Sequence, residues 1–338
     1  MPPADVAVVG GRLFTRLEEL SDDLRVLETW GTWVVVLPFD GPPVCARFGG
    51  VEPVERGLAT VASASDWSGP PRASWTSSLD REGYVKAVTV VREAIAAGDV
   101  YQVNVCRRLS APLPEPVDVA ALGAALQAAN PAPHSALVRL PSAGVAVASA
   151  SPECFLRRRG AAVESRPIKG TAPVGGAFTA KDRAENVMIV DLVRNDLGRV
   201  CEYGSVEVAG LCRTERHPGL THLVSTVRGR LPRGAGWVDL LAATFPPGSV
   251  TGAPKRAALG MIAAVEPVRR GPYCGAIGWV DADRGVGELS VAIRTFWVED
   301  GALHLGTGAG IVWDSSPAAE WEETELKARR LLGAAAAR

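Results

Sequence analysis

Lys169 has clear potential for chemistry, because the chain around it is constrained. It lies in the stretch SRPIKGTAP, residues 165–173. Pro167 fixes its own φ angle and biases Arg166 towards extended geometry, while Gly170 lets a ligand approach the main chain. A lysine becomes a nucleophile only after losing its proton, so burial or a nearby cation must lower its pKa. From these residues alone, a nucleophilic lysine and a structural or carboxylate-binding lysine are both open.

Two expected helices, 181–197 and 316–337, carry acidic residues at spacings that bring side chains to one face. These residues are Asp182 and Glu185 in the first helix, and Glu320, Glu323 and Lys327 in the second. Carboxylates from two helices could hold Mg²⁺, which prefers oxygen ligands and often keeps waters and a substrate oxygen. The alternative is a solvated helix face with local ion pairs.

Two glycine-rich stretches could contact an anion. PPGSVTGAPKRA, residues 246–257, places Ser249 and Thr251 just before an expected helix whose free N–H groups suit a carboxylate or phosphate. Its spacing is not that of a Walker A loop, and a proline-capped loop explains it equally well. GTGAGI at 306–311 falls short of G-x-G-x-x-G, and a tight turn is an equal alternative.

Three charged or titratable residues lie in apolar surroundings. Arg294, within the expected strand VAIRTFWV, must be paired or face a ligand, and its planar fork suits a carboxylate. Glu153 in ASPECF is a similar buried charge, with one of the arginines 157–159 as an alternative partner. His222 in LTHLVSTV is either a hydrogen-bonded core histidine or a ligand.

The elements that must position these residues come in clusters of strands and clusters of helices. Further helices are expected over 81–99, 117–129, 236–245 and after Pro254. Clustering favours an α+β fold over strict βα alternation. We expect residues 1–75 to form a short N-terminal part contributing strands, followed by a Ser/Pro-rich linker (61–78), and residues 80–335 to form the catalytic domain.

Composition excludes several classes of protein. The 338 residues are 47% hydrophobic and 22% charged, and 36 basic residues oppose 37 acidic ones, so nothing favours nucleic-acid binding. Six cysteines without a C-x-x-C pair suggest neither a zinc site nor a disulfide scaffold. No apolar run approaches the ~18–20 residues that cross a bilayer. We therefore expect a cytoplasmic protein without nucleic-acid or membrane partners.

From about residue 81 to 332 the chain resembles the chorismate-utilising enzymes, the family of the large components of anthranilate, isochorismate and aminodeoxychorismate synthases. The resemblance is carried by the order of many motifs rather than by any one of them. These are GDVYQVNV, ASPECF, RPIKGT, AENVMIVDLVRNDLGRV, HLVSTV, FPPGSVTGAPK, CGAIGW, IRTF and GAGIVWDSSPAAEWEETELKA. The resemblance implies two packed, antiparallel-rich β-sheets flanked by helices, with the site between them.

The resemblance also implies roles for particular residues. Glu185 and Glu323 match Mg²⁺ ligands that clamp the ring carboxylate of chorismate, with Asp182 and Glu320 as neighbours. Positions matching the substrate-binding residues are Gly170 and Thr171 at the ring carboxylate, Arg294, Tyr273, Gly308 and Gly310 at the enolpyruvyl carboxylate, and Thr251 and Lys327 lining the site. His222 matches a histidine facing the ring, and Glu153 matches an acid that protonates the departing C4 hydroxyl.

Two positions separate the branches of this family. Water-adding members carry a lysine general base where Gln102 aligns, and glutamine cannot activate water as a base. Anthranilate synthases usually have alanine where this chain has Lys169, whereas lysine there resembles aminodeoxychorismate synthase. In that branch the lysine attacks C2, and ammonia then displaces it by attack at C4, giving 4-amino-4-deoxychorismate. Anthranilate synthase is the sibling alternative.

The chain has no nucleophile elbow of its own for releasing ammonia from glutamine. Cys274 in YCGAIG lacks a G-x-C-x-G-[HQ] pattern, and no H-x-E follows it. The resemblance therefore implies a separate class I glutamine amidotransferase subunit as the source of ammonia. The tryptophan-sensing motif L-L-E-S is also missing from the sequence, which argues against tryptophan feedback.

Overall fold

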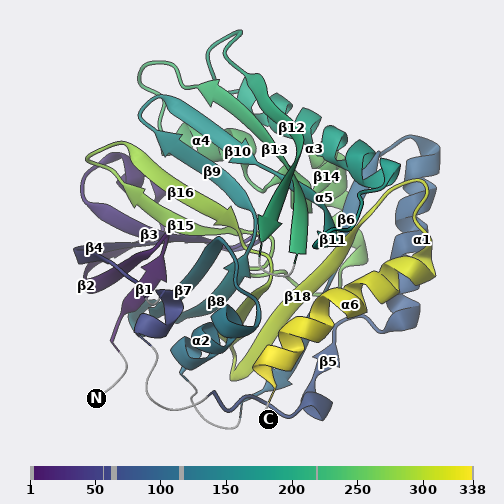
Figure 1. The fold of residues 1–338 in the computed structure, drawn as a ribbon, viewed down its shortest axis with the longest axis horizontal. Helices are drawn as coiled ribbons and strands as arrows, with labels where there is room; N and C mark the ends of the chain where they lie inside the picture. The colour runs from purple at the N-terminus through teal and green to yellow at the C-terminus, as the bar shows by residue number, and fades with distance from the viewer. Residues whose placement is uncertain (1–3, 56, 62–66, 114–117, 218–219, 337–338) are drawn as a thin grey trace.

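A computed structural model of the chain describes residues 4–55, 57–61, 67–113, 118–217 and 220–336. Its strands form one hydrogen-bonded ladder in which every described pairing is antiparallel. The ladder folds back on itself into two packed layers (Figure 1). The α+β fold with two packed β-layers, expected from the sequence, is thereby confirmed.

The first layer runs from β6 to β1 and the second from β3 to β12. In pairing order, the first contains β6 (Gln102–Pro112), β18 (Ala302–Ile311), β17 (Thr295–Glu299), β8 (Val145–Ser151), β7 (His134–Leu140) and β1 (Val6–Val9), with β5 (Thr76–Ser77) and β14 (Gly252–Ala253) beside β6. The second contains β3 (Thr32–Leu37), β15 (Ala276–Asp281), β16 (Val286–Val291), β9 (Cys154–Arg159), β10 (Ala162–Arg166) and β13 (Leu220–Arg230), which also pairs with β11 (Ile168–Pro173) and β12 (Glu207–His217).

Two ten-residue strands join the layers. They are β2 (Arg12–Ser21) and β4 (Val44–Pro53), which pair with each other, with β1 on one side and with β3 on the other. Their register shifts between Leu17 and Glu19, as at a β-bulge, which bends a strand and increases its twist. The N-terminal strands are therefore part of the same ladder as the strands that carry the candidate site.

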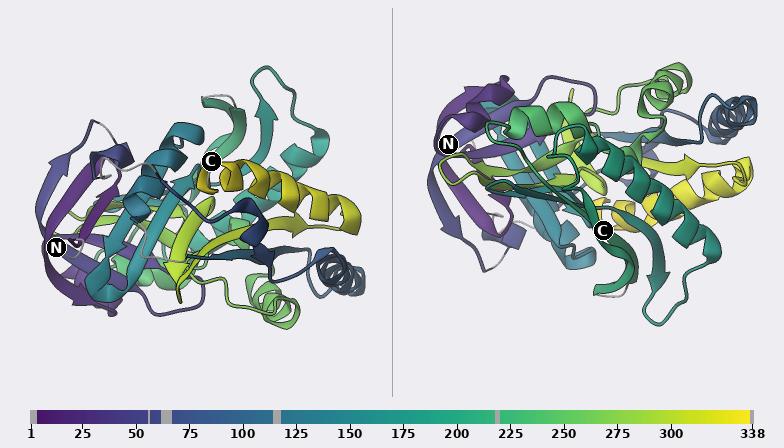
Figure 2. Two further views of the ribbon diagram at one scale, coloured as in Figure 1. Left: turned by 90° about the horizontal axis from the view of Figure 1, so that it is seen from below. Right: turned by 90° about the horizontal axis from the view of Figure 1, so that it is seen from above.

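Helices cover the outer faces of both layers. Their bounds are α1 (Arg81–Ala97), α2 (Val119–Ala129), α3 (Ala180–Gly198), α4 (Trp237–Thr244), α5 (Lys255–Val265) and α6 (Pro317–Ala335). On the first layer, α2 and α6 share one apolar cluster with β7, β8, β17 and β18, and α1 and α5 pack on β6 and β18. On the second layer, α3 packs on β11, β12 and β13 (Figure 1), and α4 lies beside α3 with Trp237 against Gly287 of β16. Figure 2 shows α1 and α6 reaching the end remote from the N-terminal strands.

Most of the expected elements are present, and local chemistry explains their ends. Helix α1 begins where Asp80 accepts a hydrogen bond from Gly83 N at 2.8 Å and ends at Gly98, whose φ of 85° suits glycine. The expected linker 61–78 contains a short 3₁₀ helix (Arg72–Ser74) and β5, and its residues 62–66 lie outside the described part.

Two sequence interpretations are corrected, and the charged segment after residue 11 forms strand β2. GTGAGI is not a turn, because it forms the second half of β18. The expected strand VAIRTFWV is not continuous, since β16 ends at Val291, β17 begins at Thr295, and Arg294 between them has a φ of 52°. In the described part of the chain, no helix is long and apolar enough to cross a membrane.

Candidate active site

Lys169 lies at the centre of the candidate site, on β11 between the two layers. Its Nζ donates a hydrogen bond to the main-chain carbonyl of Ser249 at 3.3 Å. Burial lowers the pKa of the Lys169 ammonium, and the positive charge of Lys327 acts in the same direction, while the carboxylate of Glu185 opposes them. Glu153 and Glu323 act on the same ammonium. Four parts of the chain therefore place side chains around one amine: β11, α3, α6 and the residue before β9.

Glu153 faces this amine because of a bulge in β9, the strand that begins at the following residue. Arg157 pairs with Glu288 and Cys154 pairs with Ser290, so β9 contains one residue more than β16 over this stretch. Such a bulge reverses the alternation of side chains between faces. Burial raises the pKa of Glu153 to about 7, although the Ser249 hydroxyl and the Lys169 ammonium both lower it. A neutral carboxylic acid at this position can donate a proton near neutral pH.

Two acidic residues of α3, Asp182 and Glu185, have different partners. Asp182 accepts hydrogen bonds from Thr179 N and Thr179 Oγ1 through Oδ2, at 2.8 and 2.7 Å, and so forms a capping box that starts the helix. One turn further on, Glu185 lies 3.8 Å from Lys181 Nζ. Gly170 approaches Asp182 so closely that a Cβ atom on the glycine would lie 3.1 Å from Cβ of Asp182.

On α6, Lys327 links the acidic face of the helix to strand β18. Its Nζ lies 2.6 Å from Glu323 Oε1 and donates to the Gly308 carbonyl at 3.0 Å. Burial opposes ionisation of Glu323, but Lys327 holds the pKa of this carboxyl below its usual value. Burial raises the pKa of Glu320, and the charge of Glu323 raises it further, against a hydrogen bond from Ser315.

These carboxylates fit a hard cation such as Mg²⁺. The donors are all oxygens, they come from two helices, and the repulsion between Glu320 and Glu323 is a feature that a cation would relieve. Among the described residues of α3 and α6, no three carboxylates bring an oxygen each within 4.8 Å of one another. A Mg²⁺ ion here would therefore be held by one or two of these carboxylates together with waters and substrate oxygens.

The loop that follows α4 closes the site beside Glu153. The Thr251 hydroxyl donates within this loop, to the carbonyls of Pro247 at 3.1 Å and Gly248 at 3.3 Å. Below the loop, Lys255 Nζ lies 2.7 Å from Asp196 Oδ2 and donates to the Thr244 carbonyl at 2.7 Å. This buried ion pair fixes both ends of the loop to α3.

Alternate glycines on β18 leave one face of the strand without side chains. A Cβ atom on Gly310 would lie 3.6 Å from Lys169 Nζ, and one on Gly306 would overlap the ring of Tyr273. Gly308 lies between them on the same face. The strip of bare backbone therefore extends from the buried Tyr273 ring to the Lys169 ammonium.

Arg294 and His222 flank different parts of the site. Burial together with the charge of Arg330 lowers the pKa of the Arg294 guanidinium, and no carboxylate of the described residues offsets them. A largely buried guanidinium with this surrounding suits an incoming carboxylate. His222 is buried on β13, with its Nδ1 3.0 Å from Thr171 Oγ1.

The structure thus brings Lys169, Glu153, Glu185, Glu323 and Lys327 together. Asp182 and Thr251 lie beside this group, but their side chains make the local bonds given above. Sequence reasoning did not include Gln102 among the site residues. Its Oε1 is buried without a hydrogen-bond partner in the described part of the chain, and its Nε2 would lie 2.9 Å from a Cβ atom on Gly310. Its place in the motif GDVYQVNV could have identified it, but there Gln102 was used only to separate the branches of the family.

Comparison with known proteins defines the class of enzyme. Residues 52–333 match the model of the chorismate binding enzymes. The chain is 41% identical over 313 residues to anthranilate synthase component 1 of Haloarcula marismortui, covering 88% of this chain and 63% of that protein. It is 43% identical over 272 residues to aminodeoxychorismate synthase component 1 of Klebsiella aerogenes, covering 77% of this chain and 59% of that one.

Among solved structures, the fold matches the menaquinone-specific isochorismate synthase of Escherichia coli with a TM-score of 0.82 and 20% identity, over 98% of this chain and 88% of that one. The chain belongs to the family of chorismate binding enzymes. It spans about three fifths of the length of the two curated relatives above, whose names divide between two reactions.

Proposed function

We propose that this protein is the amination component of an aminodeoxychorismate synthase, converting chorismate and ammonia to 4-amino-4-deoxychorismate. The observation that carries the proposal is the position of Lys169, an amine of lowered pKa that lies among Glu153, Glu185 and Glu323. Nucleophilic catalysis by lysine requires an amine of lowered pKa that is held in one place.

The proposed reaction has two displacements. The neutral amine of Lys169 forms a bond to C2 of chorismate, the ring double bonds shift, and the C4 hydroxyl leaves as water after taking a proton from Glu153. Ammonia then attacks C4, the double bonds return, and the lysine leaves C2 with its bonding electrons. The first displacement uses the proton that the raised pKa of Glu153, about 7, keeps on the carboxyl near neutrality.

Substrate positioning follows from the remaining residues. Arg294, whose charge no carboxylate of the described residues offsets, would receive the enolpyruvyl carboxylate, with the bare backbone of Gly308 and Gly310 beside it. Glu185 and Glu323, with Glu320 and Asp182 as neighbours, would hold Mg²⁺. When bound, the ion would neutralise the ring carboxylate of chorismate and fix its orientation.

The source of ammonia and the compartment belong to the same proposal. Relatives named as component 1 support a partner subunit, which we propose to be a class I glutamine amidotransferase. Six free cysteines are consistent with a cytoplasmic enzyme.

Anthranilate synthase is the second candidate, because the chain is also 41% identical to the Haloarcula protein of that name. The two reactions differ in their products, because only anthranilate formation releases pyruvate and makes the ring aromatic. Purified protein should therefore be incubated with chorismate, Mg²⁺ and ammonium at mildly alkaline pH, and the products resolved by chromatography and mass. 4-Amino-4-deoxychorismate supports the proposal, whereas anthranilate with pyruvate, or isochorismate, overturns it.

A further inference from the structure

A second group of ligand-type side chains lies on the other side of the backbone from the Glu153 carboxylate, at the start of β9. His134 of β7, Cys154 of β9 and Glu288 of β16 each place one ligand atom within 4.8 Å of the other two. Among the described residues this is the only group of three or more histidine, cysteine or acidic side chains that meets that distance. Its members come from both β-layers, so the group connects the first layer to the second.

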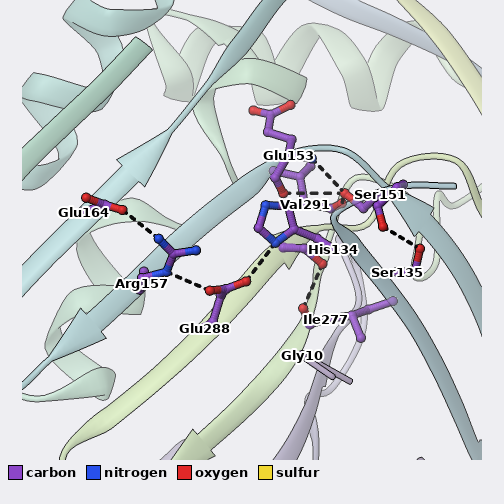
Figure 3. A network of polar contacts seen from close by, with 12 residues as sticks. Gly10, His134, Ser135, Ser151, Glu153, Arg157, Glu164, Ile277, Glu288 and Val291 are labelled. Atoms are coloured by element: carbon purple, nitrogen blue, oxygen red, sulfur yellow. Dashed lines mark hydrogen bonds and ion pairs between the residues drawn. The ribbon is translucent and has the colours of Figure 1, made fainter. Parts of the chain in front are cut away.

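The extra residue in β9 creates this group. β10 has the same mismatch with β9 as β16 has, since Glu164 pairs with Arg157 and Arg166 pairs with Cys154. The bulge therefore turns the Cys154 side chain to the face that Arg157 occupies, and the preceding Glu153 to the opposite face. Figure 3 shows the Glu153 carboxylate pointing away from His134 and Glu288.

Each oxygen of the Glu288 carboxylate has a hydrogen-bond partner. His134 Nδ1 lies 2.7 Å from Glu288 Oε1, and Arg157 Nε donates to Oε2 at 2.7 Å (Figure 3). Arg157 in turn donates to Glu164 at 2.9 Å. Chains of this kind, in which an outer residue orients a ligand, are characteristic of metal sites.

We propose that His134, Cys154 and Glu288 form a site for a divalent metal ion of the zinc type, separate from the acidic faces of α3 and α6. One nitrogen, one sulfur and one oxygen donor leave a fourth tetrahedral position for water, and a thiolate ligand selects against Mg²⁺. Two such ligands of one zinc ion lie roughly 3.3 Å apart, so His134 and Glu288 need to separate by only about half an ångström.

The chemistry of binding is a proton exchange. The buried thiol of Cys154 gives its proton to solvent and forms a sulfur–metal bond. The proton that His134 Nδ1 shares with Glu288 moves to Nε2 of the same ring, so that the free Nδ1 lone pair binds the ion and one proton is released overall. The guanidinium of Arg157 remains beside the site and balances part of the added negative charge. The site lies one residue from Glu153, whose carbonyl accepts from Val291 N at 3.0 Å, so occupancy would brace the backbone that carries this acid.

Cobalt(II) is the most direct probe, because a thiolate ligand gives Co²⁺ a charge-transfer band in the near ultraviolet. The full chain should be stripped with a chelator and titrated with Co²⁺ in the presence of excess Mg²⁺. We expect one equivalent of Co²⁺ to give the band, and one equivalent of Zn²⁺ to abolish it. Absence of the band from the wild-type protein overturns the proposal, whatever reaction the enzyme catalyses.

Variants locate the site. Cys154→Ser should remove the band, and His134→Gln should weaken Zn²⁺ binding about 10-fold or more. Cys201→Ser alters a partly exposed thiol outside the group, and Glu323→Gln alters the proposed Mg²⁺ site; both should retain the band. Circular dichroism checks that each variant is folded. A band that survives in folded Cys154→Ser, or disappears in Glu323→Gln, assigns the metal to other residues and contradicts the proposal.

Discussion

Gly310 faces the amine of Lys169 so directly that a Cβ atom on the glycine would lie 3.6 Å from Nζ. The same atom would lie 2.9 Å from Gln102 Nε2, closer than side chains normally approach. The Gly310→Ala variant should therefore displace Gln102 and crowd the substrate, and we expect kcat/KM for chorismate to fall about 10- to 100-fold. Gly333→Ala on α6, where a Cβ atom meets nothing within 4 Å, is the matched control. Unchanged kinetics in Gly310→Ala would show that this face of β18 does not contact substrate.

Lys169→Ala tests the covalent step. Removing the amine should lower the rate of amination by about 10³-fold or more, equivalent to about 4 kcal/mol of transition-state stabilisation. Chorismate should still bind, as measured by calorimetry, because Arg294 and the metal-site carboxylates are unchanged. Lys86→Ala, an exposed lysine of α1, serves as the control. Normal turnover in Lys169→Ala would remove the covalent role while leaving the family assignment intact.

The buried acid Glu153 should make stability depend on pH. Its pKa is about 7 in the folded protein against 4.5 when unfolded, so the folded state holds the extra proton between these values. The stability of the neutral form is fully present below pH 4.5 and is lost as pH rises through 7. At pH 8 the Glu153→Gln variant should therefore be more stable than the wild type, by on the order of 3 kcal/mol.

Chemical denaturation at pH 8 and at pH 4.5 measures this difference. The gain should be absent at pH 4.5, where the wild-type carboxyl is also neutral. Glu93→Gln, an exposed residue of α1, should show no such dependence. An equal effect of Glu153→Gln at both pH values would mean that the carboxyl ionises normally.

Removal of divalent metal tests the acidic faces of α3 and α6. EDTA should abolish turnover and Mg²⁺ should restore it, because the ring carboxylate of the substrate would otherwise face Glu185 and Glu323 directly. Glu323→Gln should raise the Mg²⁺ concentration needed for half-maximal activity about 10-fold or more. Turnover that is indifferent to EDTA would contradict the assignment of these carboxylates as metal ligands.

Periodicity predicted the helices well, because α1 and α6 each bury one face and begin at recognisable signals, the Asp80 cap of α1 and Pro317 in the first turn of α6. It failed at β18, a strand that contains several glycines, and at the break between β16 and β17. Glycines on β18 looked like turn residues, but they sit in a strand whose partner is β6. Arg294 looked like a strand residue, but its φ of 52° places it in the link between β16 and β17. Local propensity cannot distinguish these cases, since pairing partners decide them.

The composition of the candidate site was predictable only through the order of many motifs. Spacing alone gave acidic pairs, and it did not reveal that Asp182 caps its own helix. His134, Cys154 and Glu288 were not recognised as a group, because they are far apart in sequence and meet only through a bulge in β9. Residues that come from three separate strands have no regular spacing in the sequence, so a sequence motif cannot reveal them.

The ladder that joins the two layers also has a consequence for how the chain acquires its fold. Leu37 of β3 pairs with Ala276 of β15, and Val8 of β1 pairs with Leu137 of β7. During synthesis, β1 and β3 are therefore made long before β7 and β15, the strands that pair with their edges. High contact order of this kind slows folding and leaves a strand edge open to other nascent chains. Strands β1 and β3 thus have an unpaired edge until residues 134–140 and 276–281 have been made.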